Sequence, residues 1–165
     1  MAEATLEGLF QEALKDIYYA ENKILKALPK MASAAQSSEL KAGFEKHLME
    51  TEGQVDRLEQ VFELIGMQPE GKECPAIDGI IEEGEEIIQN FAGSPALDAG
   101  LVASAQAVEH YEIARYGTLC AWATTLGMTE AASLLQETLD EEVQTDLDLT
   151  DLAEESVNEA ALVAA

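Results

Sequence analysis

Apolar residues recur every three or four positions in four long segments of the chain, which is the spacing of one face of an α-helix. Pro and Gly are scarce inside these segments and gather between them. We therefore predict four long helices. Their approximate limits are residues 5–34, 39–66, 96–126 and 130–158.

The breaks between these helices differ in length, and the difference predicts the topology. Short breaks separate the first helix from the second and the third from the fourth, so residues 5–66 and 96–158 should each form an antiparallel hairpin. The crossover, residues 67–95, is long enough to run the length of a bundle and carries a further short helix near 80–91. We predict one all-α domain over residues 1–165, a ferritin-like four-helix bundle.

A weak internal repeat supports this organisation. A shift of 91 residues aligns the apolar positions and helix starts of the two hairpins without a gap. The same shift places Glu21 on Glu112 and Glu50 on Glu141. Glu is common in this chain, so some of these matches could arise by chance. We nevertheless interpret the pattern as a duplicated helical hairpin.

Two of the apolar stripes contain carboxylates. Glu21 lies on the stripe of the first helix, four residues after Ile17 and three before Ile24. Glu112 lies near the centre of the stripe of the third helix, and Glu109 lies on its shoulder one turn earlier. Both helices are therefore expected to direct carboxylates toward the core.

The second and fourth helices have polar positions at matching places. In the second helix His47 interrupts the apolar stripe and Glu50 lies on its shoulder, three residues away. In the fourth helix Glu141 takes the shoulder position, while Glu142 lies nearer the centre. We expect one carboxylate from each of the four helices to point toward a common interior.

Several unpaired buried carboxylates would destabilise an ordinary domain beyond what it can tolerate. Arg115 lies near the stripe and could neutralise one of them. Two divalent cations could balance four, and Glu and His ligands suit iron or manganese, with zinc a poorer match. Alternatively, these Glu residues reach solvent at helix edges or pair with Arg115 and a Lys, and His47 is a hydrogen-bonded core residue.

Composition narrows the choice of partners and compartment. The chain has 33 acidic and 9 basic residues and a net charge of −24, so nucleic acid would be repelled. No apolar run is long enough to span a membrane, and the first residues do not resemble a signal peptide. The two cysteines lack the spacing of a disulfide or metal framework. We predict a cytoplasmic protein.

Three segments, LKDIYYAENKILKALPKMA, HLMETEGQVDRLEQVFELIG and AVEHYEIARYGTL, resemble the YciF-like family of the ferritin-like superfamily. The resemblance covers about residues 5–155. It implies bacterial stress-response proteins, often homodimers, with a candidate di-metal site between the helices. Transferred to this sequence, the metal ligands would be Glu21, Glu50, Glu112 and Glu141, with His47 and Glu109 as additional candidates.

The sequence departs from the superfamily at one feature. Many of its members carry Glu-x-x-His on the second and fourth long helices, whereas here the third residue after Glu50 is Gly53 and the third after Glu141 is Gln144. We predict that the protein holds two metal ions in a carboxylate-rich centre and reacts there with oxygen or peroxide. The alternative is a non-enzymatic bundle that binds metal or a protein partner.

Overall fold

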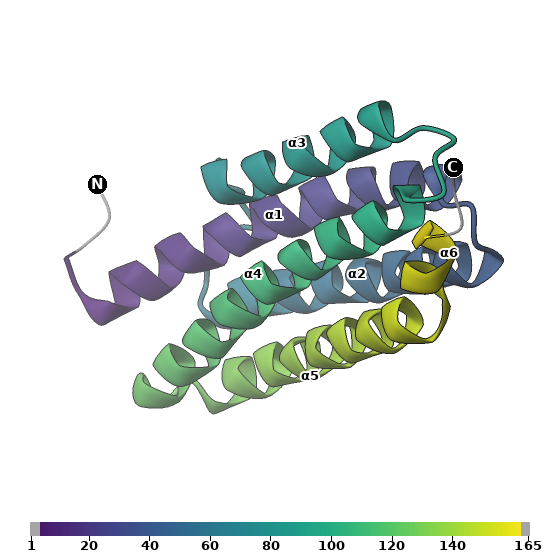
Figure 1. Cartoon of the computed structure of the whole chain (residues 1–165). Coiled ribbons are helices and arrows are strands. Elements are labelled where there is room, and N and C mark those ends of the chain that lie inside the picture. Colours follow the sequence, from purple (N-terminus) through teal and green to yellow (C-terminus); the bar gives the residue numbers. More distant parts are fainter. Residues whose placement is uncertain (1–3, 163–165) are drawn as a thin grey trace.

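The computed structural model describes residues 4–162, and within that range every regular element is helical, with no strand (Figure 1). The all-α prediction is confirmed. The elements are α1 (Leu6–Ala34), α2 (Ser38–Leu64), α3 (Pro75–Asn90), α4 (Leu97–Thr125), α5 (Thr129–Leu152), a π-helical turn (Ala153–Val157) and α6 (Asn158–Leu162).

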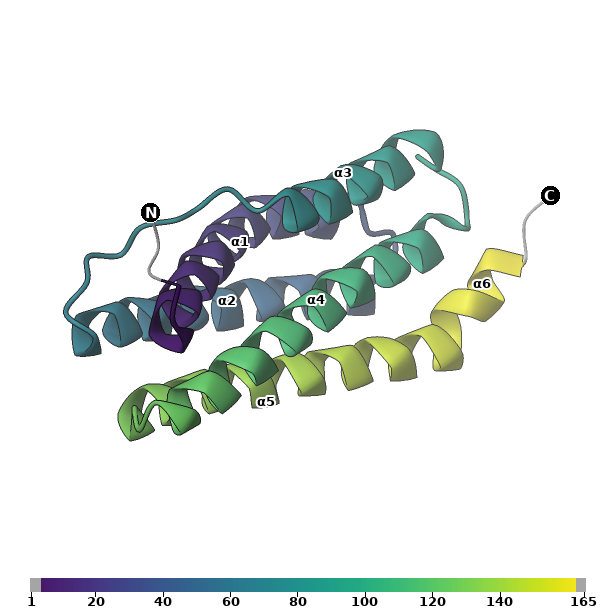
Figure 2. The ribbon, with the colours of Figure 1, turned by 90° about the vertical axis from the view of Figure 1, so that its left-hand side faces the viewer.

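The four long helices form two antiparallel hairpins. Helix α1 packs against α2 and α4 packs against α5, and the two pairs meet through contacts of α1 with α4 and of α2 with α5. After α2 the chain runs back in an extended segment along the bundle, and α3 then lies over α1 and α4 (Figure 2). This is the connectivity of a ferritin-like four-helix bundle, as predicted.

Helix ends follow local chemistry, and the start of α3 differs most from the prediction. Ser37 caps the start of α2, where its hydroxyl oxygen accepts a hydrogen bond from the backbone N–H of Leu40 at 3.3 Å. Helix α3 begins at Pro75, five residues earlier than predicted, because Pro suits the first turn of a helix, where its missing N–H is not needed. At the end of α4, Gly127 adopts a φ of +76°, the left-handed conformation that Gly tolerates best.

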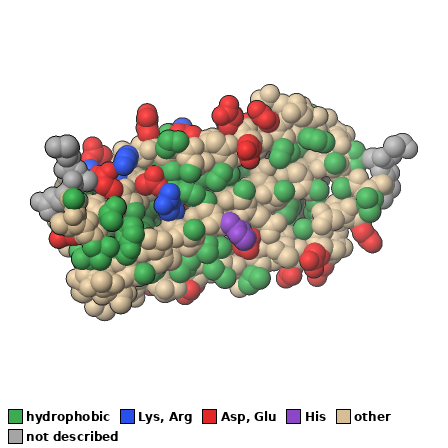
Figure 3. All heavy atoms as spheres, turned by 60° about the vertical axis from the view of Figure 1, so that its left-hand side comes forward, with side chains coloured by type: hydrophobic (Ala, Val, Ile, Leu, Met, Phe, Trp, Pro, Cys, Tyr) green, Lys and Arg blue, Asp and Glu red, His purple; other side chains and the backbone are tan. Residues whose placement is uncertain are grey.

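The core lies between the four long helices and extends beneath α3. Its largest fully buried side chains include Phe10, Phe62, Leu101 and Tyr116. On the face in Figure 3, hydrophobic and charged side chains are interspersed, and acidic groups outnumber basic ones, in keeping with the net charge of −24. Among the described residues no helix has the length and apolar character that a membrane span requires.

One buried carboxylate joins the two hairpins at the end of the bundle. Asp98, in the first turn of α4, accepts hydrogen bonds from the backbone N–H groups of Gln36 and Ser37 at 2.8 and 2.7 Å. These two donors belong to the turn between α1 and α2. Hydrogen bonds to a charged acceptor are stronger than neutral ones, so Asp98 fixes the second hairpin against the first.

Replacing Asp98 with Ala should therefore lower the free energy of unfolding by about 2 kcal/mol, since two partly buried N–H groups lose a charged acceptor. Urea unfolding followed by circular dichroism measures this difference. Asp151→Ala, at an exposed helical position, is the matched control and should change stability by less than about 0.5 kcal/mol. Equal effects of the two substitutions would contradict the role given to Asp98.

Candidate metal centre

Five ionisable side chains from all four long helices meet at the centre of the bundle. They are Glu21 from α1, His47 from α2, Glu109 and Glu112 from α4, and Glu142 from α5. None of the five is more than 3% exposed. Because each lies on the inward stripe of its helix, packing the two hairpins together brings them into one cluster.

Four of these residues have the spacing of a metal site. One ligand atom from each of His47, Glu109, Glu112 and Glu142 lies within 4.8 Å of the other three. Ligands on opposite sides of a metal are about 4 Å apart when each bond is about 2.1 Å long. Small side-chain movements would therefore bring these atoms into coordinating distance.

Many polar atoms of this cluster have no hydrogen-bond partner in the protein. Both carboxylate oxygens of Glu112, both ring nitrogens of His47, and one oxygen each of Glu21, Glu109 and Glu142 are buried and unpaired. The shortest contact of His47 within the cluster is 3.3 Å, from Nε2 to Oε1 of Glu109. Buried polar atoms normally have partners, so this concentration of free lone pairs fits a bound cation.

The electrostatics of the cluster point the same way. Burial, with the nearby Glu142 carboxylate adding to it, raises the pKa of Glu21 to about 8. Burial also raises the pKa of Glu109 and of Glu112 well above the ordinary value, with Glu142 and Glu21 respectively contributing repulsion. A raised pKa means that each of these carboxyl groups holds its proton more tightly without a cation, and a divalent ion would displace that proton.

Two neutral side chains orient the carboxylates. Tyr116, fully buried on α4, donates a hydrogen bond from its hydroxyl to Glu21. Gln54, on α2, donates from its amide to Glu142. The Tyr116 hydroxyl thus meets a carboxylate of the cluster directly. Such supporting hydrogen bonds commonly hold metal-binding carboxylates in position.

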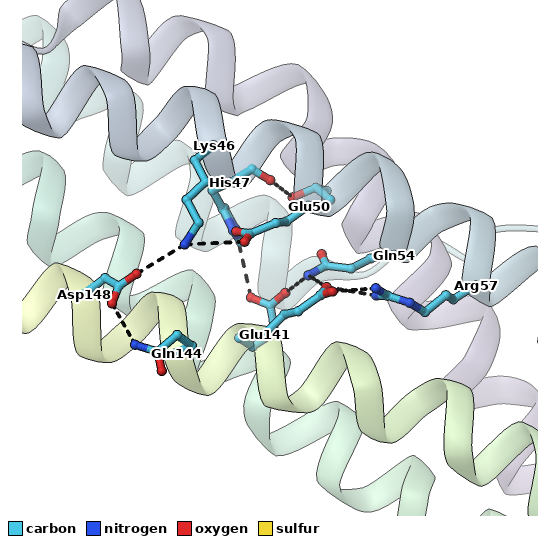
Figure 4. Close-up of polar contacts among 10 residues, drawn as sticks. Lys46, His47, Glu50, Gln54, Arg57, Glu141, Gln144 and Asp148 are labelled. Atoms are coloured by element: carbon cyan, nitrogen blue, oxygen red, sulfur yellow. Dashed lines mark hydrogen bonds and ion pairs between the residues drawn. The ribbon is translucent and has the colours of Figure 1, made fainter.

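The predicted candidates Glu50 and Glu141 lie at the edge of the bundle (Figure 4). Glu50 is 26% exposed, 3.8 Å from His47 and 3.4 Å from the Lys46 ammonium group. The nearby His47 ring, together with the Lys46 ammonium group, keeps the pKa of Glu50 below its ordinary value. Glu50 therefore borders the cluster, and its Oε2, which faces His47, is buried and has no hydrogen-bond partner.

The structure does not bring Glu141 into the cluster. Its carboxylate turns toward α2, where it pairs with the Arg57 guanidinium group, 2.8 Å from Nη1 (Figure 4). Glu142, which sequence analysis places nearer the stripe centre but not among the candidate ligands, occupies the interior. Its spacing from buried Thr138 and Thr145, four and three residues away, is the signal that could have identified it.

Arg115 does not neutralise any carboxylate of the cluster. Its side chain is 46% exposed and lies 3.7 Å from Asp16. At the two positions where many ferritin-like proteins have His, Gly53 carries no ligand, and Gln144 is exposed and donates to Asp148 at 2.7 Å. His47 is therefore the one imidazole near the buried carboxylates in the described part of the chain, since His110 is 69% exposed.

The internal repeat does not extend to the ligands. A shift of 91 residues relates His47 to Thr138 and Thr51 to Glu142, so each half carries a ligand where the other has Thr. Glu21 and Glu112, both fully buried, form the one matching pair. The repeat therefore does not relate the four ligands to one another, and Glu21 lies beside them.

A bundle of two hairpins with a long crossover, enclosing carboxylates from all four helices, defines a ferritin-like protein with a candidate metal centre. The chain belongs to the family described as Domain of unknown function (DUF892), whose profile matches residues 5–162. It is 46% identical to Protein YciF of Escherichia coli (strain K12) over 158 residues, 95% of either chain. The resemblance to YciF-like proteins is confirmed.

Two solved structures share this fold closely. The crystal structure of the E. coli stress protein YciF has a TM-score of 0.90 at 45% identity, covering 94% of this chain and 99% of that one. YcfI from Rhodopseudomonas palustris, for which a structural role has been suggested, has a TM-score of 0.88 at 48% identity, covering 91% and 97%.

The raised pKa values predict how the stability of metal-free protein depends on pH. Between the ordinary Glu pKa of 4.5 and about 8, Glu21 is ionised when unfolded but protonated when folded. The free energy of unfolding should therefore fall with rising pH, by about 1.4 kcal/mol per unit for each such group. Urea titrations at pH 5 to 8 measure this slope.

The Glu112→Gln variant is the control for that experiment, because it removes one of the protonated groups while keeping its shape. Its slope should be smaller than that of the native sequence. Stability that rises over the same pH range would show that the carboxylates are ionised in the folded metal-free protein.

Proposed function

We propose that this protein binds two divalent iron or manganese ions in the bundle core and uses them to reduce oxygen or peroxide. The observation that carries the proposal is the set of unpaired buried carboxylates around His47. Four carboxylates, those of Glu21, Glu109, Glu112 and Glu142, match the charge of two divalent ions. Oxygen and nitrogen donors together favour iron or manganese over zinc.

The residues divide into two groups by role. His47, Glu109, Glu112 and Glu142 would hold one ion, and Glu21 would extend the site toward a second. Tyr116 and Gln54 would keep Glu21 and Glu142 in position through the hydrogen bonds they donate. Two bound ferrous ions supply two electrons, which suffice, with two protons, to convert dioxygen to hydrogen peroxide or hydrogen peroxide to water.

Exclusion of water supports a redox reaction over simple metal exchange with solvent. All five side chains of the cluster are at most 3% exposed, and the core surrounds them with apolar side chains. In such surroundings an oxidant would reach the metals while bulk water is kept away from them. The name of the E. coli relative, a stress protein, is compatible with consumption of an oxidant.

A second candidate function is a non-enzymatic bundle in which metal, if bound, stabilises the fold. The neighbours of the cluster favour this second function. On the side formed by α2 and α5, Gln54 and the Arg57–Glu141 pair lie beside it. The Arg57 guanidinium group there offsets one negative charge that could otherwise serve a second ion. This function predicts metal-dependent stability without oxidant consumption.

The neighbouring residues Glu141 and Glu142 allow a matched test of metal binding. After anaerobic loading with Fe(II) or Mn(II) and gel filtration, elemental analysis should find about two metal ions per chain. Glu142→Gln should weaken binding at least tenfold, since it removes an inner carboxylate. Glu141→Gln should leave binding near the native level, because that carboxylate faces Arg57.

Absence of metal from the native protein would refute the proposal and leave a structural bundle. Equal metal content in the two variants would mean that the ligands are not the buried set. Both substitutions keep the side-chain shape, and circular dichroism confirms that each variant is folded before the comparison is made.

Reactivity is tested by mixing anaerobic Fe(II)-loaded protein with oxygen or with hydrogen peroxide and following Fe(III) absorbance. We expect oxidation at least tenfold faster than that of Fe(II) in buffer at the same pH. The Glu142→Gln protein should oxidise Fe(II) no faster than buffer. Oxidation at the buffer rate by native protein that does retain metal would favour the second candidate function.

A further inference from the structure

An apolar pocket leads from beneath α3 to the inner cluster. We call it the α3 pocket. Its walls come from α1, α3 and α4 and include Ile24, Leu28, Ile80 and Ile88, and its inner end is formed by His47 and Glu109. Helix α3 belongs to the crossover, so the part of the chain outside the four-helix core forms one wall of the pocket.

The walls of the α3 pocket are unsuited to water. Ser104 is the one hydroxyl among the lining residues, and it already donates to the Gly100 carbonyl at 3.0 Å. At the mouth, the Lys30 ammonium group is engaged by Glu85 at 2.6 Å. A buried water needs two to four polar partners, and between the mouth and the inner end the pocket offers it none that is free.

Its size limits what it can hold. The space open to the centres of water-sized molecules is about 30 Å³. A single water needs roughly 10 to 15 Å³ by this measure, so the pocket accommodates one or two small molecules and excludes an acyl chain. Hydrogen peroxide has the right size but would lose its hydrogen bonds to water inside, at a cost of several kcal/mol. Dioxygen has none to lose.

We propose that the α3 pocket is the route by which dioxygen reaches the His47–Glu109 end of the inner cluster. The proposal rests on the proposed redox function and names its substrate as dioxygen. Helix α3 thereby has a role in the reaction, as the wall that keeps this route apolar. Gly84 contributes to that wall, since its missing side chain leaves room beside Ser104.

A second pocket reaches the same two residues from the side of α2, α4 and α5, and charged groups line part of it beside apolar ones such as Phe44 and Leu149. It lies between α2, α4 and α5, and its lining includes Lys46, Glu50 and Asp148 around a space of about 60 Å³. The Lys46 ammonium group lies 3.4 Å from Glu50 and 3.3 Å from Asp148 (Figure 4). Because this pocket offers charged groups as well as apolar ones, it is the alternative route against which the α3 pocket is tested.

The test separates binding of an apolar gas from reaction with it. Xenon is an apolar probe for such cavities, and crystals of metal-free protein under xenon pressure should show it in the α3 pocket. Gly84→Val should abolish that site, because a Cβ at Gly84 meets Ser104 at 3.5 Å and the added methyl groups fill the pocket. Gly43→Val, which lines the second pocket where a Cβ meets nothing within 4 Å, should leave xenon bound.

The same variants are then loaded with Fe(II). Gly84→Val should slow oxidation by oxygen at least tenfold while leaving Fe(II) affinity and oxidation by hydrogen peroxide unchanged. Gly43→Val should keep the native rate with oxygen. Ala27→Leu, on the α1 wall of the α3 pocket, is a second obstruction that should reproduce the effect if Gly84→Val is poorly folded.

Each outcome bears on one of the two proposals. Absence of xenon from the α3 pocket, or an oxygen rate that obstruction leaves unchanged, overturns the assignment of this route. Native protein that binds xenon but oxidises Fe(II) no faster than buffer refutes the redox function instead. In that case the α3 pocket remains an apolar gas-binding cavity without a role in delivering dioxygen.

Discussion

Four carboxylates buried around a single imidazole are the constraint on which the architecture of this protein depends. In the part of the chain that the structure describes, no Lys or Arg pairs with Glu21, Glu109, Glu112 or Glu142. Their mutual repulsion opposes the packing of the two hairpins, which must bring them together to close the core. Protons or cations must therefore accompany folding, and the same groups that strain the bundle make it able to bind metal.

The surrounding structure separates this interior from an acidic exterior. Arg57 and Lys46 stand at the bundle edge, where they pair with Glu141 and Glu50 and so keep these two carboxylates out of the cluster. Helix α3 covers the other side with isoleucine side chains. The inner cluster is thus reached beneath α3 by an apolar pocket and beside Lys46 by a pocket that also carries charged groups.

Much of the fold follows from local patterns that a sequence displays. The apolar stripes, the short breaks and the long crossover predict two hairpins in a ferritin-like bundle, because helical period and connection length leave few other arrangements. The buried positions of Glu21, Glu109, Glu112 and His47 follow from the same stripes. The same stripes do not fix the helix boundaries, since the start of α3 at Pro75 depends on how the crossover packs against the bundle.

The sequence by itself determined which helices form, how they connect and that carboxylates face the core. Only the tertiary structure decided between Glu141 and Glu142, since neighbouring residues on a helix differ by 100° and the position of α2, with Arg57 and Gln54, selects which one turns inward. It also decided that Tyr116 meets Glu21 and that α3 encloses an apolar pocket. Such contacts join residues 95 positions apart, as in Tyr116 and Glu21, and no local pattern encodes them.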